Sequence, residues 1–406
     1  MAGVPSEPPA APRQYSCLIC HNPMAEAGAE CAHCRRRSTP VSFAAPAWLT
    51  IAGVVAATLV MWVLTGVLTS HFREARAVRQ DEHEHIAASL AASGAHEEAV
   101  REYRAALEYD RSGLEARLGL AEALLASGQP SAARNHLLDL RAADPTHALA
   151  SYLLAGIAAR AGSLDDAVAH YRTAVHGRWP EGTQARRLQA RLELAEALVS
   201  SGKQLEAVAE LAASLEEAPE QPGVRKRIGQ LLLDADAPAQ AGDVFRSVVR
   251  KAPQDAGAWM GLGASEFGQG NYLSARTAFT RASAITPVPG VQRWLGLCNQ
   301  IIDLDPTYRR AGTRERLRRS HDLAARAVVE LQRCLPLAAS AQPSSAELLE
   351  RAEAVLSRSV PAGRAEDFVE ENISLAEELW AARDVWCPGV EPVDEPLRYV
   401  LEKVSR

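Results

Sequence analysis

The amino-acid sequence predicts an all-α protein built from repeated helix pairs, preceded by a small cysteine-rich module and one long apolar helix. Two observations lead to the helical prediction. Alanine is abundant while aromatic residues make up only 5% of the 406 residues, and alanine loses no side-chain entropy when it enters a helix. Small residues also recur every 34 residues through the middle of the chain, a period typical of stacked helix pairs.

The overall composition is that of an ordinary globular protein. Hydrophobic residues make up 47% and charged residues 23% of the chain, so the length allows two or three domains with cores of their own. The formal net charge is −6, which gives no reason to expect nucleic acid as a partner.

The N-terminal segment contains four cysteines at the spacing of metal ligands. Residues 1–14 are rich in proline and predict a disordered tail. Two pairs of cysteines follow, with two residues inside each pair and ten between the pairs: Cys17, Cys20, Cys31 and Cys34. Two such pairs supply four thiolates for one tetrahedral Zn²⁺ ion, and the metal contributes folding energy that so short a segment lacks. We therefore expect one structural zinc ion in residues 15–37.

This module resembles the small zinc ribbons of bacterial membrane proteins, although His21 and Arg35 stand where those ribbons have glycine. Two other interpretations remain open. Cys17 to His21 matches the haem-attachment pattern CxxCH, and Cys17 and Cys20 could form a redox dithiol, as in thiol-reducing factors of cytochrome c maturation. Both leave the second cysteine pair unexplained and require an exported N-terminus, for which no signal peptide precedes Cys17.

A long uncharged segment predicts one membrane-spanning helix over residues 47–70. No Asp, Glu, Lys or Arg occurs between Arg37 and Arg73. The apolar run Trp48–Leu68 extends about 31 Å as a helix, at about 1.5 Å per residue, which matches the hydrocarbon core of a bilayer. Linkers are expected on either side, at 38–46 and 71–81.

The orientation of this helix is not decided by arginine counting. Three arginines precede the span and three follow it: Arg35, Arg36, Arg37, Arg73, Arg76 and Arg79. A reduced tetracysteine site suits the cytosol. The sequence therefore favours an N-terminus in the cytosol with the remainder outside, and the resemblance to bacterial zinc ribbons implies a bacterial cytoplasmic (inner) membrane.

The clearest pattern in the chain is the recurrence of residues every 34 positions between about 82 and 290. The recurring positions include three glycines and three alanines: Gly94, Gly128, Gly162, Ala99, Ala133 and Ala167. The step from Ala167 to Ala207 is 40 residues, because extra residues lie near 176–184. The spacing then returns to 34 up to Ala275. The pattern predicts six copies of one helix pair.

These copies resemble the tetratricopeptide repeat (TPR), which has glycine at the turn between its helices, small and aromatic residues in its second helix, and proline after it. The best copy contains Trp259, Leu262, Gly263, Gly270, Ala275, Phe279, Ala282 and Pro287. The resemblance implies a superhelical solenoid in which small residues let the helices approach and apolar residues fill a continuous core. Residues 82–290 are therefore expected to form six TPR repeats.

The TPR resemblance also implies a function. The concave face of such a solenoid is lined by the first helix of each repeat and binds an extended peptide or a helix of a partner protein. The groove positions expected here are Glu115, Glu122, Gln189, Leu192, Glu196, Lys226, Gln230, Met260 and Phe267. Their mixed charge does not match the dense basic clamp of chaperone-binding TPR proteins.

Residues 291–406 keep helical periodicity but lose the 34-residue spacing, which predicts divergent helical repeats and a cap. An arginine-rich helix over 309–333 is expected to pair with the acidic helix 364–385 or to face solvent, with binding of anionic lipid or nucleic acid as alternatives. A linker is expected at 339–345. The remaining cysteines are scattered and are expected to be separate, buried thiols: Cys298, Cys334 and Cys387.

Nothing in the sequence indicates an enzyme. It contains no phosphate-binding glycine loop, no GxSxG and no HExxH. His83 and His85 could bind a metal weakly, but they are expected on a solvated helix face. We therefore predict a membrane-anchored scaffold that binds proteins and has no small-molecule substrate. The alternative is a thiol-redox or cytochrome c maturation factor that uses Cys17 and Cys20.

Overall fold

The computed structural model describes most of the chain, in two compact units. The described residues are 15–26, 29–35, 47–218, 220–287, 289–308, 310–337, 344–361 and 363–405. The tail predicted at 1–14 and the linker predicted at 38–46 lie outside them. Unit 1 comprises Met1–His85 and Ala105–Arg111, and unit 2 comprises Ile86–Arg104 and Ser112–Arg406.

Unit 1 contains a small hairpin and most of a long helix. Strands β1 (Tyr15–Ser16) and β2 (Pro23–Met24) pair antiparallel. Helix α1 (Ala47–Ala92) has 46 residues and runs without a break through residues 71–81, where a linker was expected. No glycine or proline occurs in that segment to end the helix, so the helix continues.

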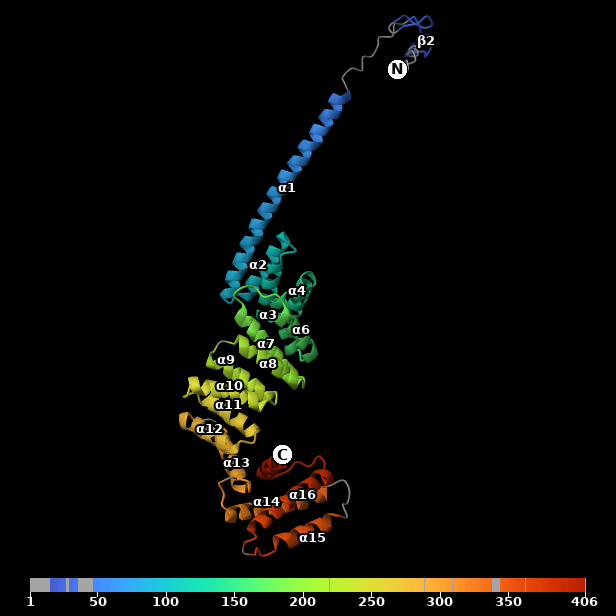
Figure 1. Cartoon of the computed structure of the whole chain (residues 1–406). Helices are drawn as coiled ribbons and strands as arrows, with labels where there is room; N and C mark the ends of the chain where they lie inside the picture. The colour runs from blue at the N-terminus through green and yellow to red at the C-terminus, as the bar shows by residue number, and fades with distance from the viewer. Residues whose placement is uncertain are drawn as a thin grey trace, which may run out of the picture. The chain divides into compact units, whose positions relative to one another are not determined.

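Unit 2 contains the repeats, in which consecutive helices pack against each other from α3 to α13 (Figure 1). The first repeat comprises the end of α1 followed by α2, whose last residues, from Ala105 on, are counted in unit 1. The helices of the repeats are α2 (His96–Tyr109), α3 (Leu114–Ala126), α4 (Pro130–Ala143), α5 (Ala148–Arg160), α6 (Leu164–His176), α7 (Gln184–Ser200), α8 (Gln204–Glu217), α9 (Pro222–Asp234), α10 (Pro238–Lys251), α11 (Ala256–Gly268) and α12 (Tyr272–Ile285). These bounds follow the predicted 34-residue register.

The turn inside each repeat requires a left-handed residue, which explains the recurring glycine. Gly128 has φ 77°, and its N–H donates to the carbonyl of Leu125 at 3.2 Å. This hydrogen bond satisfies one of the free carbonyls at the end of α3. In the fifth repeat the same position is Asp236, with φ 55° and a matching bond to Leu233 at 3.0 Å. Aspartate is one of the few residues other than glycine that adopt this conformation at moderate cost.

In the described residues that follow α12, unit 2 continues with further α-helices. They are α13 (Val291–Leu304), α14 (Thr313–Cys334), α15 (Ser344–Leu356), α16 (Ala365–Trp386) and α17 (Glu395–Val404), with a 3₁₀ turn, η1 (Leu335–Leu337), after α14. The predicted arginine-rich and acidic helices correspond to α14 and α16, which pack along each other. Arg316 on α14 forms an ion pair with Glu366 on α16 at 2.8 Å. Helix α17, which the sequence analysis did not single out, packs against α13.

Two of the scattered cysteines form a disulfide, which corrects the expectation that they are separate thiols. Cys334 at the end of α14 is bonded to Cys387 after α16, with 6.0 Å between the Cα atoms. Both are buried. The remaining scattered cysteine, Cys298, is a free thiol with no exposed surface. Its burial raises the thiol pKa to about 11, so it is uncharged and unreactive at neutral pH.

Two glycines of the best repeat let helices approach closely. A Cβ atom added to Gly261 would lie 2.2 Å from Cζ of Phe245, and one added to Gly263 would lie 2.5 Å from Cε1 of Phe279. Both rings are buried, so neither can move away into solvent. A close-packed interior does not accommodate an extra methyl group at such distances.

The substitution Gly261→Ala is therefore expected to destabilise the chain by about 2 kcal/mol or more, because it overpacks the contact with Phe245. Gly296→Ala on α13 is the matched control, since nothing lies within 4 Å of its added Cβ. That change should stabilise by about 0.5–1 kcal/mol, as helical Gly→Ala substitutions do. Thermal unfolding of both chains, followed by circular dichroism, measures the difference. Equal melting temperatures would contradict the close packing.

Candidate functional site

The four N-terminal cysteines come together in one cluster. The Sγ atoms of Cys17 and Cys34 are 3.5 Å apart, as are those of Cys20 and Cys31. All four sulfurs lie within 4.8 Å of one another. A tetrahedron with Zn–S bonds of about 2.3 Å has edges of about 3.8 Å. The spacing of the sulfurs therefore fits the ligand set of one tetrahedral ion.

Each cysteine pair is held by a tight backbone turn in which the residue after the pair is left-handed. His21 has φ 57° and Arg35 has φ 49°. The N–H of His21 donates to the carbonyl of Cys17, and that of Arg35 to Cys31, both at 2.8 Å. These two residues thus adopt the conformation for which related modules use glycine, and the departure from the usual pattern does not prevent either turn.

The same turns aim backbone N–H groups at the sulfurs. The N–H groups of Cys20 and Ile19 lower the pKa of the Cys17 thiol to about 6. Those of Cys34 and His33 likewise lower the pKa of Cys31. A lowered thiol pKa favours the thiolate, which is the form that binds metals and attacks disulfides.

The first helices of the second, third and fourth repeats enclose a groove. Its volume is about 820 Å³, and it lies between α3, α5 and α7. The lining includes the apolar side chains Leu125 and Leu153 and the polar side chains Tyr152, Arg160, Arg186 and Glu193. The groove thus combines apolar surface with charged groups of both signs.

A carboxylate in the groove lining accepts hydrogen bonds from two tyrosines. Glu193 accepts hydrogen bonds from the hydroxyls of Tyr152 at 3.1 Å and Tyr171 at 2.9 Å. Burial, together with Glu193, raises the pKa of Tyr152 to about 12, so this hydroxyl remains a neutral donor. Arg186 pairs with Glu122 at 3.3 Å. Arg160 is exposed and forms no ion pair with another described residue.

The extra residues of the 40-residue step support the groove. The N–H of Arg178 donates to the carbonyl of Thr146 at 2.8 Å, which fixes the insertion to the start of α5. The ring of Trp179 then lies 6.2 Å from that of Tyr152, and its indole N–H donates to the carbonyl of Ala174. The insertion therefore positions one of the tyrosines that line the groove.

The groove residues expected from the TPR pattern differ in whether they line the groove, pair with other residues or lie in the core. Glu122 lines the groove. Gln189 accepts a hydrogen bond from Arg227 on α9 at 2.8 Å, and Glu196 forms an ion pair with the same arginine at 3.4 Å. Leu192 and Phe267 are only 3% and 7% exposed, so they belong to the core and are not available to a partner. The other expected positions are Glu115, exposed; Lys226, paired with Asp255; Gln230, exposed and bonded to Asp234; and Met260, half-buried against the core.

Of the residues that line this groove, the TPR pattern predicted Glu122 alone; the polar ones that it missed include Tyr152, Arg160, Arg186 and Glu193. Arg186 and Glu193 lie on α7, directly after the extra residues that lengthen the step to 40. That irregular step was the available indication that this part of the groove differs from the other repeats.

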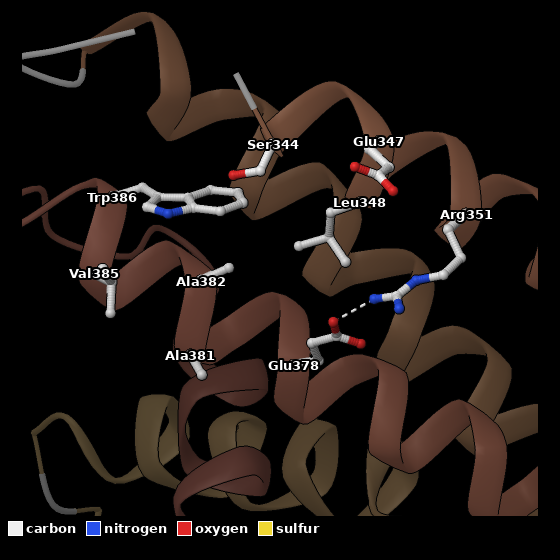
Figure 2. Close-up of a pocket in the computed structure, with 9 residues that line it drawn as sticks. All are labelled: Ser344, Glu347, Leu348, Arg351, Glu378, Ala381, Ala382, Val385 and Trp386. Carbon is white, nitrogen blue, oxygen red and sulfur yellow. Dashed lines mark hydrogen bonds and ion pairs between the residues drawn. The ribbon is translucent and has the colours of Figure 1, made fainter. Parts of the chain in front are cut away.

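A second hollow of about 490 Å³ lies between α15 and α16 (Figure 2). Trp386 lies at one end and the ion pair of Arg351 with Glu378 at the other, with Leu348 between them. The lining between this ion pair and Trp386 is thus mostly apolar, and the carboxylate of Glu347 also borders it.

Comparison with known proteins identifies the repeats. Two tetratricopeptide-repeat family models match the chain, at residues 90–157 and 226–288. None of the curated proteins matches it.

The solved structures similar to the chain include the following three, each at 17% sequence identity. The TPR protein YrrB, described as having an unusual peptide-binding site, has a TM-score of 0.41 and covers 47% of this chain and 94% of its own. PilF of Pseudomonas aeruginosa has a TM-score of 0.42 and covers 55% of this chain and 99% of its own. PilW, a type IV pilus biogenesis factor, has a TM-score of 0.40 and covers 53% and 98%. With the two family matches and the helix pairs described above, the chain is an all-α protein with tetratricopeptide repeats.

Proposed function

We propose that this chain is a membrane-anchored scaffold that binds protein partners in the groove between α3, α5 and α7. The observation that carries the proposal is the 820 Å³ groove on the first helices of three successive repeats. Tyrosine and arginine, both present in its lining, are the residue types enriched at protein interfaces. The exposed and unpaired Arg160 would bind a carboxylate of the partner, while Leu125 and Leu153 would contact an apolar side chain.

The substitution Leu153→Asp tests the groove, because it places a charge against the apolar part of the lining. It should weaken partner binding about tenfold or more. The matched control is Leu205→Asp on α8, because Leu205 is 87% exposed and lies outside the groove lining. Tagged full-length chains are purified from cross-linked cells, and the bound proteins are quantified by mass spectrometry.

The proposal predicts a defined set of proteins that is lost with Leu153→Asp and retained with Leu205→Asp. Recovery of the same proteins in equal amounts with both variants would contradict the groove assignment. Thermal unfolding of the Leu153→Asp chain checks that the change acts on binding rather than on folding.

The proposal includes one structural zinc ion held by Cys17, Cys20, Cys31 and Cys34. The spacing of the four sulfurs and the two backbone turns support it. When bound, zinc supplies folding energy to a segment too short for a sufficient core. The four thiolates leave no open coordination position, so the chain's own residues at this site hold structure and do not catalyse a reaction.

A thiol-redox or cytochrome c maturation role is the second candidate, and the lowered pKa of Cys17 favours it. The position of the second pair weighs against it, because the Sγ of Cys20 is as close to Cys31 as that of Cys17 is to Cys34. A dithiol enzyme needs only one pair, whereas a metal site uses both. The same point weighs against haem attachment at Cys17 to His21.

The N-terminal part of α1 is proposed as the membrane anchor. This helix is long and apolar enough to cross a membrane, by length and composition. Its apolar side chains are exposed in the structure, with Trp62 75% and Ile51 63% exposed. Such a row of exposed apolar side chains would be unfavourable in water and is favourable in a lipid bilayer.

The disulfide and the tetracysteine cluster support a topology in which they lie on opposite sides of the membrane. The disulfide between Cys334 and Cys387 belongs to an oxidising compartment, whereas a tetracysteine zinc site is stable in a reducing one. We therefore place the zinc module in the cytosol and the TPR unit outside it, across a bacterial cytoplasmic membrane. The free Cys298 does not oppose this, because it is fully buried.

A further inference from the structure

A hollow lined by cations lies where the last helix approaches the turn before α12 and the loop between α13 and α14. Two adjoining cavities of about 420 and 710 Å³ share four lining residues: Leu273, Ser274, Tyr308 and Lys403. The lining thus comes from three segments far apart in the sequence. Lys403 on α17 is contributed by the C-terminal cap rather than by a repeat.

The larger cavity carries three cations and no carboxylate among its lining residues. The cations are Arg276, Arg310 and Lys403. Lys403 pairs with the buried Asp305 at 2.5 Å, and one guanidinium nitrogen of Arg276 donates to Asn299 at 3.2 Å. Arg310 is exposed and forms no ion pair with any other described residue. Asp305 neutralises Lys403, so the positive charges of Arg276 and Arg310 remain without a carboxylate partner among the described residues.

Hydroxyl groups add further hydrogen-bond donors to the same lining. Ser274 and Tyr308 line both cavities, and neither hydroxyl forms a hydrogen bond within the part of the chain that the structure describes. The ring of Tyr308 is held in place by the guanidinium of Arg319, which lies 5.5 Å from the ring centroid. Guanidinium groups without a carboxylate partner and hydroxyls without a hydrogen bond are donors that can bind oxyanions.

We infer that this hollow binds an acidic segment of a protein partner, whose carboxylates pair with Arg276 and Arg310. Arginine binds carboxylates through paired N–H donors, and Arg276 and Arg310 line the same cavity from two different segments, so that each can pair with a carboxylate of one peptide. Adjoining cavities of about 420 and 710 Å³ are also much larger than a single phosphate group. The site lies apart from the groove between α3, α5 and α7 and does not depend on that groove for its function.

The test uses the full-length chain in detergent and a fluorescein-labelled hexaglutamate peptide, with binding followed by fluorescence anisotropy in about 50 mM salt, where charge pairing is only moderately screened. The double variant Arg276→Gln/Arg310→Gln should bind the peptide about tenfold or more weakly than the wild-type chain. The matched control is Arg281→Gln, because Arg281 is an exposed arginine on α12 outside the cavity lining. It should bind within about twofold of wild type.

Every other outcome overturns the inference. Absence of peptide binding by the wild-type chain, or an equal loss in the Arg281→Gln control, would show that no specific acidic-peptide site exists here. Inorganic pyrophosphate is the competing probe. If it binds tightly and displaces the peptide at equal concentration, the site takes small phosphate ligands instead. A circular-dichroism melt of the double variant within a few degrees of wild type excludes unfolding as the cause of a loss.

Discussion

Replacing Cys31 with serine is expected to abolish tight zinc binding by the N-terminal module. Cys31 is buried, and its Sγ lies 3.5 Å from that of Cys20. Its removal leaves three thiolates, whereas structural zinc sites of this size depend on four ligands for most of their folding energy. The apparent free energy of zinc binding by such modules is about 10–16 kcal/mol, shared among four ligands. Loss of one thiolate should therefore weaken zinc binding by about a hundredfold or more.

The measurement is the zinc content of the purified full-length chain after dialysis against a competing chelator. The wild-type chain should retain one zinc ion per chain and the Cys31→Ser chain none. Cys298→Ala is the control, because that cysteine lies outside the cluster and should leave the zinc content unchanged. A wild-type chain without metal but with a titratable dithiol would support the redox alternative, and cobalt substitution without a thiolate charge-transfer band would contradict four sulfur ligands.

Removal of the disulfide is expected to destabilise the C-terminal helices by about 4 kcal/mol. The bond between Cys334 and Cys387 joins residues 53 positions apart, and the entropy of closing a loop of that length in the unfolded chain gives this magnitude. The double variant Cys334→Ala/Cys387→Ala should therefore unfold at a lower temperature than the wild-type chain under oxidising conditions.

The control for this prediction is a reductant. Reduction should lower the unfolding temperature of the wild-type chain and leave that of the double variant unchanged. Cys298→Ala should keep the sensitivity to reductant, because this thiol takes no part in the bond. A wild-type chain that is unaffected by reductant, and whose Cys334 and Cys387 are both alkylated without reduction, would contradict the disulfide.

The repeats and the cysteine turns could be predicted from the sequence because both depend on short-range patterns. Each turn needs one residue in the left-handed conformation, so glycine recurs there with the repeat. The turn also persists in the fifth repeat, where Asp236 takes the place of glycine. Each cysteine pair is likewise held by a turn of five residues. The helical nature of 71–81 was also readable, since the segment has no helix-breaking residue, but its polarity suggested a linker.

The groove and the disulfide could not be predicted because both depend on contacts between distant segments. Tyr152 and Glu193 are 41 residues apart, and the ring of Trp179, from the extra residues, packs beside that of Tyr152. The pattern placed Leu192 on the groove, but its helix turns it into the core at 3% exposure. Periodicity gives the face of a helix only within about a third of a turn, which is too coarse to separate a groove wall from the adjacent core.

We propose that the chain crosses a membrane between the zinc module and the TPR unit, because a tetracysteine zinc site is stable in a reducing compartment and a disulfide in an oxidising one. The most direct measurement is a reporter phosphatase that is active only outside the cytosol, fused after residue 406 and expressed in a bacterial host. The same reporter fused before residue 15 is the control. High activity is expected for the C-terminal fusion and none for the N-terminal one. No activity from the C-terminal fusion, with a cytosolic reporter active at that position, would contradict it.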